Sequence, residues 1–326
     1  MNIQKVLVAG CGTMGSQIAM QAARYGYSVQ VYDLSQQARE KAEQYAHSWF
    51  NRQVSKGRMT WEEAQAAVAR LTFTGDLAQA AAGADLVIEA VPDVAKIKRA
   101  VLSQIDQYVP EHALYGSNSS YLVSSIFADS VRHPDRVANL HFFNPVLVME
   151  LVEVVQGPHT SKETVEQLME FARSIGKTPV LVQKEIYGFV VNRIFSAITK
   201  EACYLLDQQV ASLEDIDMAV KKGLGHPMGP FELLDMTGID LEYNVLMEKF
   251  RTTMDPADRP AAALVERYAQ GAYGRKTGRG FYTYGEQGET KNGERKTDQA
   301  DDRRGRSPAG DLPGKSTQCP QPSGGG

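Results

Sequence analysis

The segment "VLVAGCGTMGSQIA" at residues 6–19 constrains the fold of this chain more than any other stretch. Its apolar start predicts a buried strand, and an apolar helical pattern follows. Between the two, Gly10, Gly12 and Gly15 form a G-x-G-x-x-G pattern, and the next β-rich run ends at Asp33, 18 residues after the last of these glycines. Together these features are typical of a βαβ unit that binds the pyrophosphate of a dinucleotide.

Each glycine has a physical purpose in such a loop. Gly10 would make the tight turn, Gly12 would let the backbone approach the pyrophosphate, and Gly15 would let the helix pack closely on the sheet. Thr13 leads into a helix that is expected from about Met14, and the N-terminus of this helix offers N–H groups and a positive dipole to the phosphates. The loop is therefore predicted to hold the cofactor through its backbone.

Asp33 and Cys11 are the other candidates near this loop. Asp33 would accept hydrogen bonds from ribose hydroxyls and repel a 2′-phosphate, which predicts NAD rather than NADP. The structural alternative is a helix-capping aspartate beside a glycine-rich turn. Cys11 lies beside a helix N-terminus, where the pKa of a thiol can fall. No base lies near it in sequence, so we interpret it as a small filler residue within the cofactor loop.

The pattern of elements divides the chain into three parts. Residues 1–183 alternate β-rich runs with helical stretches, which predicts a Rossmann-type doubly wound α/β sheet, with the strands parallel. Residues 184–285 predict an all-α C-terminal domain, with one long helix and three further helical stretches up to about Gln270. Residues 286–326 are rich in Gly, Pro and charge, and predict a disordered tail.

Composition excludes several functional classes. The formal net charge of −4 gives no basic footprint for nucleic acid. Cys11, Cys203 and Cys319 share no close spacing, so neither a disulfide framework nor a zinc site is expected. No run of about 18 apolar residues and no signal-like start occurs, so a cytoplasmic protein without a membrane span is predicted.

Two further polar segments, "IEAVPD" and "GSNSS", follow apolar strands. They should lie at the carboxyl edge of the sheet, where open α/β folds bind ligands. Asn118 and Ser120 are predicted to lie close to the nicotinamide, with a polar turn as the alternative. Asp93 and Lys98 flank the start of the next helix, where helix capping and a solvated charge would explain them equally well.

The segment "HFFNPVLVMELVEVV" holds a candidate acid–base pair. His141 ends a strand, a turn at Asn144 and Pro145 follows, and Glu153 lies among valines in the return strand. A buried carboxylate needs a partner. A carboxylate on one ring nitrogen would fix the imidazole tautomer and stabilise the imidazolium, as expected for a general base that removes an alcohol proton. For stability alone, Glu153→Val would be harmless or helpful, whereas the catalytic interpretation predicts a folded protein with a large loss of turnover.

The motifs resemble those of one known family. "GCGTMG", "IEAVPD", "SNSS", "HFFNP" with "LVEVV", "GFVVNRI", "GHPMGPFELLD" and "GRKTGRGFYTY" occur in this order over residues 3–284. Together they resemble the L-3-hydroxyacyl-CoA dehydrogenase family, which includes bacterial 3-hydroxybutyryl-CoA dehydrogenases. The resemblance implies a Rossmann domain followed by a helical domain through which two chains form a homodimer.

Carried over by position, the resemblance implies particular roles. His141 becomes the catalytic base and Glu153 its orienting partner, while Ser120 and Asn192 line the region of the substrate's 3-oxygen and thioester. Lys56 matches a position that contacts coenzyme A, although an exposed lysine on a helical arm is also commonly just solvated. The NAD contacts implied outside the glycine loop are Asp33, Glu89, Asp93, Lys98, Asn118 and Asn144.

The predicted function is therefore reversible, NAD-dependent oxidation of a short-chain L-3-hydroxyacyl-CoA, such as 3-hydroxybutyryl-CoA. A dehydrogenase of a free hydroxy acid, of the L-gulonate or carnitine type, is the alternative on the same fold. A non-catalytic NAD-binding or structural protein is a third possibility, which the intact His141, Glu153, Ser120 and Asn192 disfavour. Acyl-chain length depends on a cleft in the helical domain and is not encoded in a motif.

Overall fold

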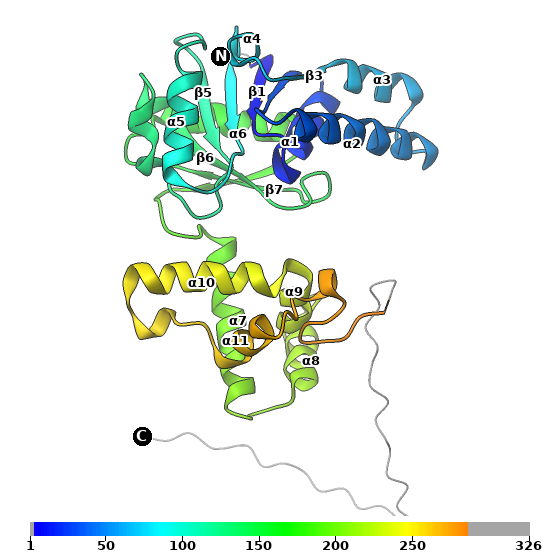
Figure 1. Ribbon diagram of the computed structural model, residues 1–326, viewed down its shortest axis with the longest axis vertical. Helices are drawn as coiled ribbons and strands as arrows, with labels where there is room; N and C mark the ends of the chain where they lie inside the picture. Colours follow the sequence, from blue (N-terminus) through cyan, green and yellow to red (C-terminus); the bar gives the residue numbers. More distant parts are fainter. Residues whose placement is uncertain (1–2, 286–326) are drawn as a thin grey trace, which may run out of the picture.

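The computed structural model describes residues 3–285, and the predicted tail lies outside this range. An eight-stranded sheet with flanking helices stands beside a separate group of helices (Figure 1). The strand order is β3-β2-β1-β4-β5-β6-β7-β8. The strands are β1 (Lys5–Ala9), β2 (Ser28–Tyr32), β3 (Leu71–Thr74), β4 (Leu86–Glu89), β5 (Leu114–Ser117), β6 (Val137–Phe142), β7 (Leu151–Val155) and β8 (Thr178–Val182).

Helices cover both faces of this sheet. They are α1 (Thr13–Arg24), α2 (Gln36–Ser55), α3 (Trp61–Ala69), α4 (Leu77–Ala81), α5 (Ala95–Ile105) and α6 (Lys162–Ser174). In β1, Val6 and Val8 pack with Ile18 of α1, whereas Leu7 between them packs with Ile105 of α5. Because successive side chains alternate between the two faces and both are covered, the strand is apolar throughout. The predicted doubly wound α/β fold is confirmed.

One pair of strands departs from the parallel pattern. β6 and β7 run antiparallel, with His141 opposite Glu153 in the register, while every other neighbouring pair is parallel. Between them the chain turns at the cis peptide bond Asn144–Pro145. The predicted strand, turn and return strand are therefore present in this segment.

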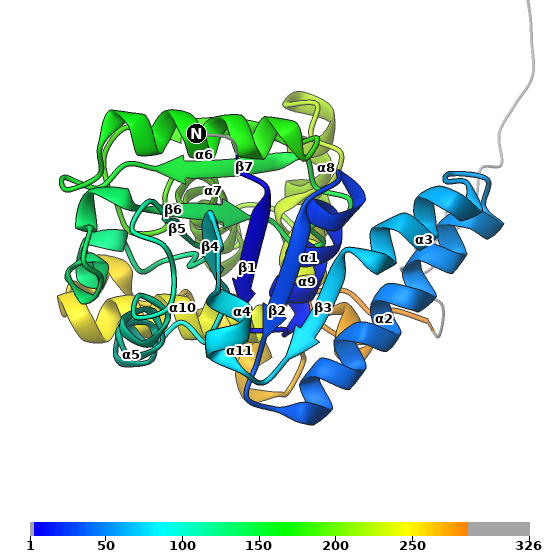
Figure 2. The same ribbon diagram turned by 90° about the horizontal axis from the view of Figure 1, so that it is seen from above.

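Helices α2 and α3 form an arm that projects from the β3 side of the sheet (Figure 2). Ser35 caps α2 by accepting from the Ala38 N–H, and Thr60 opens α3 with a capping box. Phe50 of α2, Ala64 of α3 and Met20 of α1 belong to one buried apolar cluster, which anchors the arm on the sheet domain. Most charged side chains of the arm are exposed to solvent.

The remaining helices form the second group, as predicted. They are α7 (Val191–Asp207), α8 (Leu213–Gly223), α9 (Pro230–Thr237), α10 (Ile239–Thr253) and α11 (Ala262–Ala269). Four helices follow α7 in the described range, where the sequence predicted three. Only Gly238, with φ 110°, separates α9 from α10, and a helical periodicity does not reveal such a short break. The predicted boundary near Lys184 falls between β8 and α7.

No helix within the described residues is both long and apolar enough to cross a membrane.

Candidate active site

His141 and Glu153 form the centre of the site. The register of β6 and β7 sets them opposite one another, and the imidazole Nδ1 lies 2.9 Å from the carboxylate Oε2. Both side chains are almost fully buried. The structure thus makes the pairing that the sequence predicted, and the carboxylate is not an isolated buried charge.

Glu153 also holds the start of α7. Its Oε1 accepts hydrogen bonds from the backbone N–H groups of Val190 at 3.0 Å and Val191 at 2.9 Å. Burial would raise the pKa of Glu153, but the hydrogen bonds from His141 and these two N–H groups bring it below its ordinary value. The carboxylate is therefore ionised at neutral pH and ties β6 and β7 to the helical domain.

The other ring nitrogen of His141 meets a hydroxyl. Nε2 lies 3.1 Å from Ser120 Oγ. The rings of Phe143 and Phe189 flank the imidazole, with centroids at 4.5 and 5.4 Å. Phe189 has φ 48°, an uncommon conformation for a bulky residue, directly after Gly188 at φ 75°. The sequence did not predict that Phe189 packs on His141, because nothing in "YGFVV" signals the positive φ that brings its ring there.

The glycine loop has the geometry that a pyrophosphate requires. Gly10 has φ 96°, and a Cβ there would lie 2.7 Å from the carbonyl oxygen of Ala90. A Cβ on Gly15 would collide with the carbonyl of Gly10, whereas one on Gly12 would meet open space. No described side chain caps α1, so its N-terminal N–H groups remain available to an anion. These observations fit a bound dinucleotide.

Asp33 closes this loop from the end of β2. Its Oδ2 accepts from the Cys11 N–H at 3.0 Å and its Oδ1 from the Ser35 N–H at 2.8 Å. Burial, together with Asp33, raises the pKa of the Cys11 thiol to about 12. The thiol therefore stays protonated, which agrees with its interpretation as a filler and not with a reactive cysteine.

Glu89 and Lys98 lie together beneath the sheet edge. The Lys98 ammonium is 2.8 Å from Glu89 Oε1 and 3.1 Å from Asp93 Oδ1, and both Lys98 and Glu89 are 1% exposed. Ser117 donates to Glu89 Oε2 at 2.6 Å, and the Val91 N–H donates to Oε1 at 2.7 Å. Lys98 and Glu89 are thus each other's counter-ion. Asp93 is 41% exposed and pairs with Lys98 from the solvent side, and the predicted NAD contacts of all three stay predictions.

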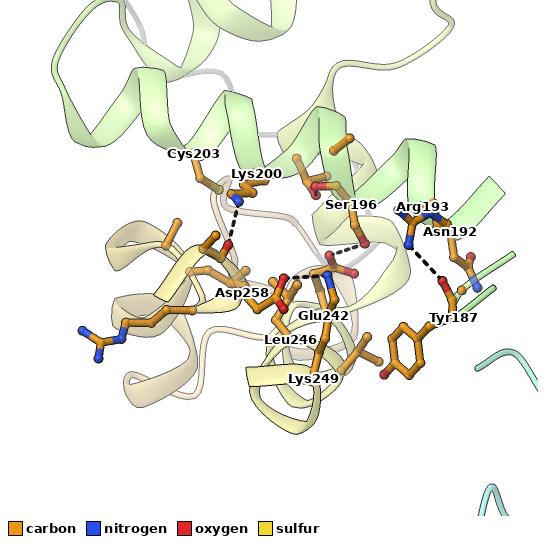
Figure 3. Close-up of a pocket in the computed structure, with 18 of the residues that line it drawn as sticks. Tyr187, Asn192, Arg193, Ser196, Lys200, Cys203, Glu242, Leu246, Lys249 and Asp258 are labelled. Carbon is orange, nitrogen blue, oxygen red and sulfur yellow. Dashed lines mark hydrogen bonds and ion pairs between the residues drawn. The ribbon is translucent and has the colours of Figure 1, made fainter. Parts of the chain in front are cut away.

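The remaining predicted residues lie in four different places. Asn118 accepts from the Phe142 N–H at 2.9 Å, which positions the end of β6 beside β5. Asn144 is exposed in the cis turn. Asn192, in the first turn of α7, borders a cavity of about 210 Å³ that continues into the helical domain (Figure 3). Lys56 is exposed directly after α2, in the turn between α2 and α3.

Within the described residues, no cluster of three or more His, Cys, Asp or Glu side chains is arranged to hold a metal ion.

The fold and the site together define a class. A glycine loop that leads into an uncapped helix, an aspartate at the end of β2 and a buried His–Glu pair belong to a nicotinamide-dependent dehydrogenase.

Comparison with known proteins identifies the family. Residues 5–186 match the NAD-binding domain of 3-hydroxyacyl-CoA dehydrogenase, and residues 188–284 match the C-terminal domain of the same family. The chain therefore belongs to the 3-hydroxyacyl-CoA dehydrogenases, NAD-dependent oxidoreductases, and the resemblance seen in the motifs is confirmed.

Individual relatives differ in how much of them the chain covers. It is 39% identical to the 3-hydroxyadipyl-CoA dehydrogenase of Escherichia coli over 87% of its own length, but spans only 59% of that protein. It is 37% identical to a probable 3-hydroxybutyryl-CoA dehydrogenase of Bacillus subtilis, covering 88% of the chain and 99% of the relative. The solved structure of (S)-3-hydroxybutyryl-CoA dehydrogenase from Ralstonia eutropha is similar, with 37% identity, a TM-score of 0.82, and coverage of 87% and 100%.

Proposed function

We propose that this protein catalyses the reversible oxidation of a short-chain L-3-hydroxyacyl-CoA, with 3-hydroxybutyryl-CoA as the representative substrate, to the 3-ketoacyl-CoA. The observation that carries the proposal is the buried hydrogen bond between His141 and Glu153, with Nε2 of the same imidazole facing the Ser120 hydroxyl. The names of the relatives from Bacillus subtilis and Ralstonia eutropha support the substrate class.

In this proposal His141 is the general base. Because the ionised Glu153 accepts from Nδ1–H, the free lone pair lies on Nε2, where it can take the proton of the substrate's 3-hydroxyl. The imidazolium that forms is stabilised by the same carboxylate at 2.9 Å. NAD, when bound, would accept the hydride that leaves the carbinol carbon. The products are the ketone, NADH and the proton held on His141.

Ser120 and Asn192 are proposed to steady the 3-oxygen as it becomes a carbonyl. Ser120 is already within hydrogen-bond distance of His141, and Asn192 follows the two residues whose N–H groups bind Glu153. The base and the two polar groups are therefore tied to the same carboxylate. Their relative positions depend on the β6–β7 hairpin and α7 staying together.

The residues present fit NAD, and the proposed contacts divide into two sets. The backbone of the glycine loop and the N-terminus of α1 would bind the pyrophosphate, with Asp33 against the adenosine ribose. The second set would face the nicotinamide half from the edge of the sheet. It consists of Glu89, Asp93, Lys98, Asn118 and Asn144.

Coenzyme A recognition is proposed at the arm. Lys56 is exposed beside Arg52 and Arg58, which are also exposed, at the turn between α2 and α3. Three positive side chains at one exposed turn suit the phosphates of coenzyme A. A free hydroxy acid would make no use of this distant charge, which favours the acyl-CoA over the gulonate or carnitine alternative.

An activity comparison tests this function. Purified protein is expected to reduce NAD with 3-hydroxybutyryl-CoA and to do so at least about a hundredfold more efficiently, as kcat/KM, than with L-gulonate or carnitine. NADP is expected to replace NAD poorly, because its 2′-phosphate would meet the Asp33 carboxylate. Formation of NADH is followed by absorbance. Equal rates with the free acids, or no reaction with the CoA ester, would contradict the proposal.

We also propose that two chains associate through the helical domain. Val210, Leu224 and Leu241 are large apolar side chains that lie exposed in this part of the molecule. Such exposure is typical of a surface that another protein covers. Light scattering after size-exclusion chromatography is expected to give twice the chain mass of 35.9 kDa, and a monomer at micromolar concentration would contradict this expectation.

A further inference from the structure

The cavity in the helical domain begins at the proposed catalytic centre. Tyr121, next to Ser120, and Asn192 line one part of it. From there it follows one face of α7, past Ser196 and Lys200, and α10 closes the other side with Glu242 (Figure 3). An acyl chain that extends from the reacting carbons past Asn192 would enter this cavity.

Glu242 is an unexpected side chain in such a place. It is 5% exposed, and Ser196 Oγ donates to its Oε1 at 3.1 Å. No hydrogen bond to its Oε2 comes from any residue in the range 3–285. The carboxyl group therefore borders the cavity with half of its hydrogen-bonding capacity unused.

The four cations around the same cavity are engaged elsewhere. Arg193 donates to the carbonyl of Tyr187 at 3.4 Å, and the Arg259 guanidinium lies over the ring of Phe250. Lys249 pairs with Asp258 at 2.6 Å, and Lys200 donates to the carbonyl of Ala257 at 2.6 Å. Burial raises the pKa of Glu242, and only the hydrogen bond from Ser196 opposes this effect. The described part of the chain thus provides no counter-ion for Glu242. A buried carboxyl group with one unpaired oxygen at a cavity favours an occupant that donates a hydrogen bond.

We propose that Glu242 makes the distal cavity selective for acyl chains that carry a hydrogen-bond donor, such as a hydroxyl, amide or ammonium group, beyond the reacting carbons. An alkyl terminus would cover the carboxyl group without satisfying it, and an ω-carboxylate would offer Glu242 no hydrogen-bond donor. The inference rests on the proposed function and deepens it, because it names a specificity-determining residue for the same reaction.

The spacing along α7 sets the chain length. Asn192 and Ser196 are one turn apart, which corresponds to a rise of about 6 Å. If the substrate's 3-oxygen lies at Asn192, an extended acyl chain needs roughly four further bonds to reach Glu242, the hydrogen-bond partner of Ser196. A substituent on C6 is therefore the first that can meet Glu242.

Three six-carbon substrates test the selectivity. They are 3-hydroxyhexanoyl-CoA, its 6-hydroxy derivative and the analogue with a carboxylate at C6. The full-length protein is expected to prefer the 6-hydroxy derivative over the alkyl chain by about tenfold in kcat/KM, with the carboxylate analogue last. Glu242→Met is expected to prefer the alkyl chain over the 6-hydroxy derivative. Glu242→Gln, which keeps a partner for Ser196, is expected to improve the carboxylate analogue by about tenfold.

Glu248→Gln is the matched control. Glu248 lies on the same helix, is 68% exposed and does not line the cavity, so its variant is expected to keep the wild-type order of the three substrates. Suppose that wild type and both Glu242 variants all oxidise 3-hydroxybutyryl-CoA and rank the three six-carbon substrates in the same order of kcat/KM. In that case the inference about Glu242 is wrong and the proposed function stands. If wild type oxidises no acyl-CoA, both are wrong.

Discussion

Replacing Glu153 with Gln is expected to lower kcat by about a thousandfold in a protein that remains folded. The amide has the size of the carboxylate and keeps one acceptor oxygen. That oxygen is needed by the N–H groups of Val190 and Val191, which both bind the same carboxylate oxygen. The NH₂ group must therefore face His141.

This orientation would reverse the imidazole tautomer. With an NH₂ group 2.9 Å from Nδ1, that nitrogen must accept, and the ring proton moves to Nε2. Nε2 would then face Ser120 and the substrate as a donor and could not take the proton of an alcohol. The variant loses the base without losing the histidine.

Steady-state kinetics and thermal unfolding check this result together. His141→Gln and the double variant are expected to be about as slow as Glu153→Gln, because the two residues act as one unit. Glu166→Gln, an exposed carboxylate on α6, is the control for the chemical change and should keep the wild-type rate. A Glu153→Gln enzyme within about threefold of wild type would contradict the proposed role of the pair.

The pH dependence of stability gives an independent readout of Glu153. Its folded pKa lies below the ordinary value of 4.5, so its ionisation stabilises the fold fully above pH 4.5 and this contribution is lost as the pH falls through the lower, folded pKa. Wild type should exceed Glu153→Gln by about 1–2 kcal/mol in urea unfolding at pH 7. The difference should shrink below pH 4.5, and a constant difference would contradict the assignment.

The same contacts correct one expectation from the sequence. Among valines, Glu153→Val looked harmless or helpful to stability, but the change would leave the N–H groups of Val190 and Val191 without their acceptor. Each buried unsatisfied donor costs about 1–3 kcal/mol. These contacts argue against the expectation, and the sequence could not reveal them because the donors lie 37 and 38 residues further along the chain.

The sequence predicts best what depends on short stretches of chain. Gly10 and Gly15 could be assigned because a glycine loop is a local requirement of backbone geometry. His141 and Glu153 could be paired because a single turn brings the strands together. Glu242 could not be singled out, since its surroundings come from α7 and from its own helix α10, and burial beside a cavity leaves no trace in helical periodicity.

Lys98 and Glu89 are a second case in which the sequence did not predict the surroundings of a side chain. Their place after strands at the sheet edge suggested contacts with NAD, and the structure adds a buried ion pair that the spacing did not reveal. Lys98→Met is therefore expected to destabilise the protein by about 3–5 kcal/mol, because it leaves Glu89 charged and buried with only Val91 N–H and Ser117 as donors. Urea unfolding measures the loss, and Lys96→Met, at an exposed position of α5, should change little.

Adding Glu89→Gln to Lys98→Met is expected to restore most of that stability. The amide oxygen can accept from the Val91 N–H, and its NH₂ group can donate to Ser117 Oγ once that hydroxyl turns, so no buried charge remains. Failure of the second change to restore stability would contradict the counter-ion argument. The KM for NAD in the restored protein then tests the cofactor contacts of Lys98 and Glu89 together, because both side chains are changed. A rise of about tenfold would support a direct cofactor contact by one of the two residues, and an unchanged KM would contradict both contacts and leave the pair a structural role.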